Sequence, residues 1–232
     1  MQTLAVIPAR GGSKRIPRKN IKEFNGRPLI SYSIDAALKS DLFTRVIVST
    51  DDQEIAAIAK DCGAEVPFMR SAKLSDDHTG TFEVVRDAFL RMKDQGFDAC
   101  ETCCIYSTAP LLTPDYLKKA HARFEGEGAD YLYACCEYPF PIQRAQYIGE
   151  DGTPVPVMPK YMSWRSQDLP KAYQDCGMFY FYSRRILEDP GTPGLVSRAY
   201  EMPRHRVIDI DTMEDWNYAQ AMCRAVTELG LD

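Results

Sequence analysis

The sequence contains no long hydrophobic run. None of its apolar segments approaches the roughly 18 residues that a membrane span needs. The apolar run from Leu4 to Pro8 is followed at once by Arg10, so it is too short and wrongly flanked for a signal peptide. Internal repeats and low-complexity segments are also absent. We therefore expect a cytoplasmic globular protein without membrane contact.

The sequence is also poor in histidine. His78, His121 and His205 have no evident serine or cysteine partner with which to form a nucleophilic triad. His121 follows Leu117 by about one helical turn and is expected to be structural, and no role is assigned to His205.

Cysteine is not scarce, but its eight copies do not predict a disulfide framework. Cys100 and Cys103 have the Cys-x-x-Cys spacing, and Cys135 and Cys136 are adjacent. Both groups lie in strand-like surroundings, where neighbouring side chains point to opposite faces. A zinc site is the alternative. We expect buried apolar thiols, and no disulfides in the absence of a signal sequence.

Positive charge is concentrated near the amino end. The first 22 residues contain six cations and no acid, so this segment carries +6 and the remainder −11, against −5 for the whole chain. An acidic protein with one basic segment is suited to hold a small polyanion and poorly suited to coat nucleic acid. A solvated basic arm is the alternative interpretation.

Strand-like and helix-like segments alternate along the first half of the chain. Helical patterns cover 28–38, 52–62 and 82–92, a further helix begins at 113–115, and strand-like runs cover 3–7, 45–50 and 99–106. This order predicts an α/β fold, with a Rossmann-like, mostly parallel sheet covered by helices on both faces.

Residues 130–182 break this rhythm and are rich in tyrosine, phenylalanine and proline. We interpret them as an inserted β-rich arm, used for dimerisation and sugar binding, within a single domain over 1–232. A strand-like run at 207–210 and a final helix with Thr212 as its N-cap complete the chain. The helix is expected to bury Trp216, Ala219, Cys223 and Val226.

A basic, glycine-bearing loop follows the first predicted strand. Gly11 and Gly12 let backbone N–H groups approach phosphate oxygens, while Arg10 can bind two such oxygens. Lys14 and Lys19 add compact positive charge. The spacing matches neither a Walker A loop nor a dinucleotide fingerprint. A flexible loop with ordinary surface cations is the alternative, but its place after strand one favours phosphate binding.

Two carboxylates lie close together near the other end of the chain. Asp209 and Asp211 end the strand-like run, and a period of two would place them on one face. Paired carboxylates beside a triphosphate suit Mg²⁺, which binds one or two of them together with phosphate oxygens. The alternative is a polar strand end plus a helix-capping acid.

These motifs together resemble the CMP-sialic acid synthetases and the related sugar cytidylyltransferases. The resemblance covers nearly the whole chain in order, through 8–20, 49–52, Arg70, 74–81, 108–111 and 208–211. Three further segments, 105–110, 165–169 and 173–177, make the CMP-pseudaminic acid synthetase branch the most similar.

The resemblance implies a role for each matching residue. Those implied to bind the nucleotide are Ala9, Arg10, Gly11, Gly12, Ser13, Lys14, Lys19, Asn20, Arg70, Thr79 and Thr81. The implied catalytic residues are Arg10, Lys14, Lys19 and Asp211, and the implied Mg²⁺ ligands are Asp209 and Asp211. Thr79 or Thr81 could instead cap the following helix.

The resemblance also implies a sugar site formed by Tyr106, Arg165, Gln167 and Asp175. Arg165 could bind the sugar carboxylate through two parallel hydrogen bonds. Two positions depart from the sialic acid synthetases. Tyr106 replaces a glutamine, and Cys176 replaces an asparagine before glycine. Both changes fall where the sugar should lie, which favours pseudaminic acid over N-acetylneuraminic acid.

The sequence thus predicts transfer of CMP from CTP to a nine-carbon acidic sugar, with release of pyrophosphate. The alternatives are a CMP-N-acetylneuraminic, legionaminic or Kdo synthetase, a non-catalytic nucleotide sensor on the same fold, and a nucleic-acid-binding protein. The sensor would not need Asp209 and Asp211, and the acidic remainder of the chain argues against nucleic acid. The family resemblance and the aromatic-rich arm imply a homodimer.

Overall fold

The computed structural model describes residues 1–76 and 78–231. The strands are β1 (Thr3–Pro8), β2 (Glu23–Phe24), β3 (Arg27–Pro28), β4 (Arg45–Ser49), β5 (Glu101–Ile105), β6 (Tyr131–Glu137), β7 (Gln146–Ile148), β8 (Pro154–Pro156), β9 (Tyr173–Ser183) and β10 (Ser197–Glu201). The helices are α1 (Leu29–Lys39), α2 (Gln53–Asp61), α3 (Thr81–Asp94), α4 (Pro114–Gly126), α5 (Arg184–Glu188) and α6 (Met213–Leu229). None of the helices within these residues has the length and hydropathy of a membrane-crossing segment.

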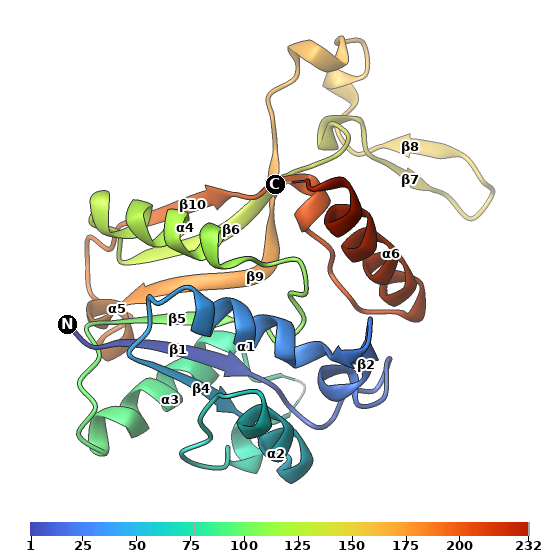
Figure 1. Ribbon diagram of the computed structural model, residues 1–232. Coiled ribbons are helices and arrows are strands. Elements are labelled where there is room, and N and C mark those ends of the chain that lie inside the picture. Colours follow the sequence, from blue (N-terminus) through green and yellow to red (C-terminus); the bar gives the residue numbers. More distant parts are fainter. Residues whose placement is uncertain (77, 232) are drawn as a thin grey trace.

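A six-stranded sheet in the order β10-β6-β9-β5-β1-β4 forms the centre of the protein (Figure 1). β9 runs antiparallel to its neighbours β5 and β6, while the other pairings are parallel. The predicted mostly parallel sheet is therefore confirmed. Because five strands share one direction, their carboxyl ends and the loops that follow them meet at one edge of the sheet.

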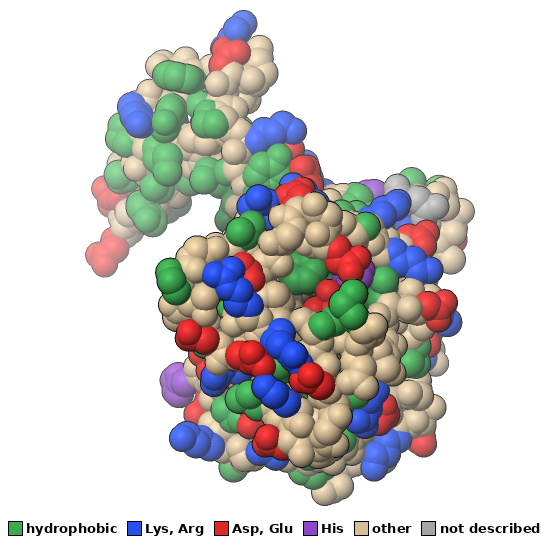
Figure 2. All heavy atoms as spheres, turned by 90° about the vertical axis from the view of Figure 1, so that its left-hand side faces the viewer, with side chains coloured by type: hydrophobic (Ala, Val, Ile, Leu, Met, Phe, Trp, Pro, Cys, Tyr) green, Lys and Arg blue, Asp and Glu red, His purple; other side chains and the backbone are tan. Residues whose placement is uncertain are grey.

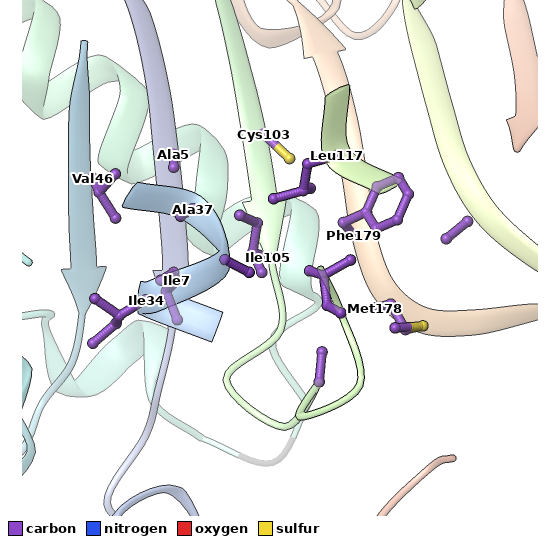
Figure 3. Packing of buried hydrophobic residues seen from close by; sticks show 14 of the residues in the cluster. Ala5, Ile7, Ile34, Ala37, Val46, Cys103, Ile105, Leu117, Met178 and Phe179 are labelled. Atoms are coloured by element: carbon purple, nitrogen blue, oxygen red, sulfur yellow. The ribbon is translucent and has the colours of Figure 1, made fainter. Parts of the chain in front are cut away.

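Helices α1, α2 and α4 cover one face of the sheet, and buried apolar side chains hold them there. Ile34 and Ala37 of α1 lie over Ile7 of β1, and Leu117 of α4 lies in the same cluster as Phe179 of β9 (Figure 3). Each of the larger side chains, such as those of Ile34 and Leu117, contributes about 1.5–3 kcal/mol when it is fully removed from water. The helical spacing of the apolar residues in the sequence thus corresponds to a packed face.

Helices α3 and α5 cover the opposite face. Phe89 and Met92 of α3 and Leu187 of α5 are fully buried in a cluster with Val6 of β1 and Tyr182 of β9. The prediction of helices on both faces is confirmed. Five of the eight free thiols are buried, as expected for apolar cysteines, namely those of Cys103, Cys104, Cys135, Cys136 and Cys176.

A third apolar cluster joins the two ends of the chain. Ile16 and Phe24 from the amino end are buried with Ile210 and Trp216 from the carboxyl end. The rings of Phe24 and Trp216 meet edge to face, with centroids 5.1 Å apart. This cluster fixes the carboxyl-terminal segment beside the basic loop, although about 190 residues separate them.

The helix starts follow the local signals in the sequence. Asp52 caps α2 by accepting hydrogen bonds from two backbone N–H groups, and Thr212 begins α6 with a capping box that includes Asp215. Pro114 stands at the start of α4 as predicted, but the side chain of Thr113 makes no capping hydrogen bond.

The predicted strand at 207–210 is wrong, because these residues have no strand assignment. The buried Ile210 and half-buried Ile208 pack against the third cluster, so the apolar alternation reflects this contact and not pairing with another strand. The sixth sheet strand is instead β10, which pairs with β6 and was not predicted.

The chain between β6 and β9 projects from the body of the protein (Figure 1). Within the range 130–182, β6 and β9 belong to the central sheet, and residues 138–172 form the projecting part, which we call the arm. The arm carries the β7–β8 hairpin and short 3₁₀ turns. Figure 2 shows many hydrophobic side chains on its surface. Phe140, Tyr147 and Ile148 are 79%, 69% and 68% exposed.

Candidate functional site

A cavity of about 340 Å³ opens beyond the carboxyl ends of β1 and β5. This is the edge at which open α/β sheets bind ligands. The sequence-predicted residues that line the cavity are Arg10, Ser13, Lys14, Lys19, Asn20, Arg70, Thr79, Thr81, Tyr106, Asp209 and Asp211. Segments from the beginning, middle and end of the chain therefore contribute to one site.

The basic loop leaves β1 and forms one wall of the cavity. Gly12 has open space where a Cβ would be, whereas a Cβ on Gly11 would lie only 2.6 Å from Oδ2 of Asp52. Gly11 is therefore required by the close approach of Asp52, and its backbone N–H donates to Asp51 Oδ1 at 3.0 Å. Ala9 is buried at the start of the loop.

Asn20 ties the loop to the segment that follows β5. Its side-chain amide donates to the carbonyl oxygen of Arg10 at 2.9 Å, and Ser107 Oγ donates to Asn20 Oδ1 at the same distance. Asn20 and Ser107 are buried, so these hydrogen bonds are shielded from water. Asn20 thus connects the two halves of the cavity floor.

The basic loop and the carboxyl-terminal acids are in direct contact. Lys19 Nζ donates to the carbonyl oxygen of Ile210 at 2.5 Å and lies 3.5 Å from Asp211 Oδ1. Arg15 forms an ion pair with Asp211 at 2.8 Å. The structure therefore brings the two predicted clusters of opposite charge into one cavity.

Asp209 lies in the same cavity, where burial and the neighbouring charge of Asp211 act on its carboxyl group. Partial desolvation raises the pKa of its carboxyl group, and the negative charge of Asp211 raises that pKa further. A cation between the two carboxylates would relieve this repulsion. Two hard oxygen donors beside a phosphate site are the ligand set that Mg²⁺ uses, so the residues fit the predicted ion.

The segment from Arg70 to Thr81 forms a second wall. Arg70 is buried and lies 3.7 Å from Asp51, and Arg10 Nη1 donates to the carbonyl oxygen of Asp76 at 2.8 Å. The basic loop is thus linked to this wall. The alternative that a threonine caps α3 is wrong, since the N-cap is Gly80 and no side chain caps the helix.

Thr81 and Tyr106 join this wall to the predicted sugar site. Their hydroxyl oxygens are 2.9 Å apart, and the Tyr106 ring lies 5.4 Å from that of Tyr180. Burial raises the pKa of Tyr106, so its hydroxyl stays protonated. Tyr180 donates a hydrogen bond to Asp175 Oδ1 at 2.8 Å, and the Gly177 N–H donates to the same oxygen at 2.8 Å.

Arg165 and Gln167 lie elsewhere. Both belong to the arm, and neither lines the cavity as far as the described residues define it. Arg165 pairs with its neighbour Asp168, with Nε and Oδ2 at 2.6 Å. The structure thus separates these two residues from Tyr106, which lies at the cavity, and from Asp175, which contacts the Tyr106–Tyr180 pair.

Several functional candidates were missed by sequence reasoning. Arg15, Ser107 and Thr108 line the cavity. Arg15 is one of the six cations among the first 22 residues, and Ser107 and Thr108 lie in the segment 105–110, so these signals were present in the sequence. Tyr180 and Asp175 both belong to β9 and meet across an irregularity in its pairing with β6, where Gly177 has a φ of 58°, so their contact had no sequence signal.

His121 takes part in a polar cluster with Glu101 and Glu125, none of which lines the cavity. It pairs with the buried Glu101 at the start of β5, and Nδ1 lies 3.7 Å from Glu125. The hydrogen bond to Glu101 raises the pKa of His121. The helical, half-buried position of His121 agrees with the structural role expected for it.

Comparison with known proteins gives consistent matches. A family model described as cytidylyltransferase matches residues 4–140. The pseudaminic acid cytidylyltransferase of Campylobacter jejuni is 45% identical over 223 residues, with 96% of each chain covered. The N-acylneuraminate cytidylyltransferase A of Danio rerio is 35% identical over 218 residues, which cover 93% of this chain and 49% of that protein.

A solved structure with a similar fold is that of a CMP:2-keto-3-deoxy-manno-octonic acid synthetase complexed with CTP. It aligns with a TM-score of 0.70 over 97% of this chain and 99% of that chain, at 17% identity. At this identity the comparison shows only that the two proteins share a fold over nearly the whole of both chains.

Proposed function

Since this chain belongs to the cytidylyltransferase family, we propose that it transfers CMP from CTP to pseudaminic acid, a nine-carbon acidic sugar, with release of pyrophosphate. The relatives with 45% and 44% identity over 96% of the chain are pseudaminic acid cytidylyltransferases. The departures at Tyr106 and Cys176 from the sialic acid pattern support the same sugar. We further propose that the reaction takes place in the cytoplasm.

One observation carries the proposal. Cations from the amino-terminal loop and carboxylates from residues 209–211 meet in a single cavity through the contacts of Lys19 and Arg15 with Asp211. A triphosphate needs positive charge along its length and a divalent cation at one side. The cavity offers both kinds of group within one chain.

The transfer itself requires little covalent chemistry from the protein. The anomeric hydroxyl oxygen of the sugar attacks the α-phosphorus of CTP and loses its proton to solvent. The bond between the α-phosphorus and the oxygen that bridges to the β-phosphate breaks, and that oxygen leaves with pyrophosphate. Negative charge then develops on the phosphoryl oxygens and on pyrophosphate. Arg10, Lys14 and Lys19 line the cavity and would stabilise this charge, which is the main catalytic contribution expected for phosphoryl transfer.

Asp209 and Asp211 would hold a Mg²⁺ ion, which supplies Lewis-acid stabilisation of the phosphate oxygens when bound. Asp211 also orients Lys19 and Arg15 through its two oxygens. Arg70, Thr79 and Thr81 form the wall that we assign to the nucleotide.

The sugar would occupy the side of the cavity near Tyr106. Asp175 is held by Tyr180 and the Gly177 N–H through one oxygen, so its other oxygen can accept a hydrogen bond from a sugar hydroxyl or amide. The sugar carboxylate needs a cation. Arg165 is exposed on the arm and fits this role if the arm reaches the cavity of a second copy.

We therefore also propose a homodimer in which the arms are exchanged between partners. The exposed apolar side chains of the arm, among them Phe140, Tyr147 and Ile148, support this assembly because a monomer would leave them in water. In such a dimer Arg165 would act in the partner's site.

The decisive experiment is incubation of the protein with CTP, Mg²⁺ and a panel of free nonulosonic acids, with pyrophosphate release as the readout. We expect release with pseudaminic acid and much slower release with N-acetylneuraminic, legionaminic and Kdo acids. Fastest release with one of these sugars would reassign the substrate. Binding of CTP without release for any sugar would favour a nucleotide sensor, and reaction with UTP or GTP alone would contradict the cytidylyltransferase assignment.

A further inference from the structure

The basic loop, residues 9–20, carries five cations, and four of them line the cavity. Arg18 is the exception. Its guanidinium group turns away to the start of α2. Arg18 Nη2 donates to Asp52 Oδ1 at 2.9 Å, and Nη1 donates to Oδ2 of the same carboxylate. Nη2 also contacts Glu54 Oε2 at 2.5 Å. From its charge alone, Arg18 would be expected to bind the phosphates. Its guanidinium group instead contacts Asp52 and Glu54.

Asp52 holds the other end of the same loop. A Cβ on Gly11 would lie 2.6 Å from Asp52 Oδ2, so the carboxylate packs directly against the loop where it leaves β1. The adjacent Asp51 accepts the Gly11 N–H at 3.0 Å. Residues 11 and 18 therefore both rest on the β4–α2 junction, with Ser13, Lys14 and Arg15 on the cavity side between them.

Asp52 is itself fixed by α2. Its Oδ1 accepts hydrogen bonds from the backbone N–H groups of Glu54 and Ile55, each at 3.0 Å, as the N-cap of the helix. Mainly through Arg18, the pKa of Asp52 falls to about 2, so the carboxylate is charged at any working pH. A rigid, charged group thus anchors the loop to a helix.

The backbone of Arg18 is in an unfavourable conformation. Its φ of 57° lies in the left-handed region, which residues other than glycine rarely adopt. The bidentate ion pair holds Arg18 in this conformation, together with the backbone hydrogen bonds that its carbonyl oxygen accepts from the N–H groups of Ile21 and Lys22. The next residue is Lys19, which enters the cavity and contacts Asp211. The orientation of Arg18 therefore affects where Lys19 points.

We propose that Arg18 and Asp52 are a positioning pair, which sets the spacing between the two ends of the basic loop so that its cavity-facing cations match a triphosphate. The inference rests on the proposed function, in which CTP occupies this cavity, and it adds two residues that would not touch the nucleotide.

The variant Asp52→Asn separates positioning from helix capping. Asparagine is as good an N-cap as aspartate and has the same shape, so α2 should remain capped. The amide cannot form the charged fork with Arg18. We expect the Kd of CTP, measured by titration calorimetry in Mg²⁺ buffer, to rise about tenfold. The KM of the sugar and the melting temperature should change little.

Arg18→Lys provides a second, independent change, because lysine keeps the charge but cannot form the fork. Its effect on the Kd of CTP should resemble that of Asp52→Asn, and the double variant should be no worse than the weaker-binding single variant, since both changes break one interaction. The matched control is Glu65→Gln, which breaks the bidentate Arg45–Glu65 pair at the opposite end of β4. This control should leave CTP binding unchanged.

A Kd for CTP within twofold of the unmodified protein in Asp52→Asn would overturn the proposal. So would weaker binding accompanied by a fall in melting temperature much larger than that of Glu65→Gln, since this result would indicate a structural role only. Direct CTP binding keeps the test separate from the proposed reaction: absence of turnover with every sugar would contradict the function, whereas an unchanged Kd would contradict the positioning pair.

Discussion

The cavity and the arm differ in how completely one chain provides partners for their side chains. At the cavity, charged groups from distant segments meet opposite charges or backbone acceptors, as Lys19 does with Ile210 and Asp211. On the arm, large apolar side chains such as Phe140 and Ile148 face water. The first region is a formed site, whereas the second has surface that folding of one chain leaves uncovered (Figure 2).

This difference suggests how the two substrates are divided between the regions. The groups assigned to CTP come from one chain and are held by short contacts. The groups assigned to the sugar include Tyr106 at the cavity and Arg165 on the arm, which one chain does not bring together. Changes in the cavity should therefore affect both substrates or CTP alone, while changes in the arm should affect the sugar alone.

The largest effect is expected from Asp211→Ala. Loss of this carboxylate removes a proposed Mg²⁺ ligand and the partner of Lys19 and Arg15. We expect kcat for pyrophosphate release to fall at least about 100-fold, with a melting temperature within a few degrees of the unmodified protein. Asp61→Ala, at an exposed end of α2, is the control. Retained activity with normal magnesium dependence would contradict the role of Asp211.

A tenfold effect on the sugar is expected from separating the arms. Ile148→Asp places a charge on the exposed apolar surface and should convert the proposed dimer to a monomer of 26.3 kDa, as measured by light scattering after size exclusion. The KM of the sugar should rise about tenfold, as in Arg165→Ala, while the Kd of CTP stays the same.

The control for the arm is Tyr218→Asp, which changes an exposed aromatic residue on α6, outside the arm. This variant should remain a dimer with normal kinetics. A monomeric Ile148→Asp protein with an unchanged sugar KM would show that the cavity alone binds the sugar, and the contrast between the two regions would then be wrong.

A smaller effect is expected at the border of the two regions. Tyr180→Phe keeps the ring against Tyr106 but removes the hydrogen bond to Asp175. A hydrogen bond to a charged group is worth about 1.5–3 kcal/mol. Because this one orients Asp175 and does not touch the sugar, only part of it should be lost from sugar binding, and we expect a rise of roughly fivefold in the KM of the sugar. The Kd of CTP should be unchanged, and an equal rise for both substrates would contradict a specific role in sugar binding.

The smallest effect concerns stability away from both regions. The hydrogen bond to Glu101 raises the pKa of His121 above its usual 6.5. The stabilisation is therefore fully present below pH 6.5 and is lost as the pH rises through the folded-state value. Urea unfolding of the unmodified protein and of His121→Gln should differ by about 1.5 kcal/mol at pH 6. The difference should shrink by pH 9, and a constant difference would contradict protonation of His121.

Much of the fold could be predicted because its signals are local. The apolar spacing in α1 and α3, the N-cap Asp52 and the capping box at Thr212 each act within a few residues. The run at 207–210 shows the limit of this reasoning. Alternating apolar residues occur both in a sheet strand and in a loop segment that packs one side on Trp216. Only a neighbouring strand with which to pair distinguishes the first case from the second.

The sequence by itself determined the chemistry of the protein: a basic glycine loop after the first strand, paired carboxylates near the end, and the motifs that place it among cytidylyltransferases. Only the tertiary structure decided which of these groups face one another. It turned Arg18 towards Asp52 and the other loop cations towards the cavity, brought Lys19 to Asp211, and held Arg165 away on the arm. The physical reason is that residue type fixes charge and hydrogen-bonding capacity locally, whereas the direction of a side chain depends on apolar clusters and strand pairings between distant segments.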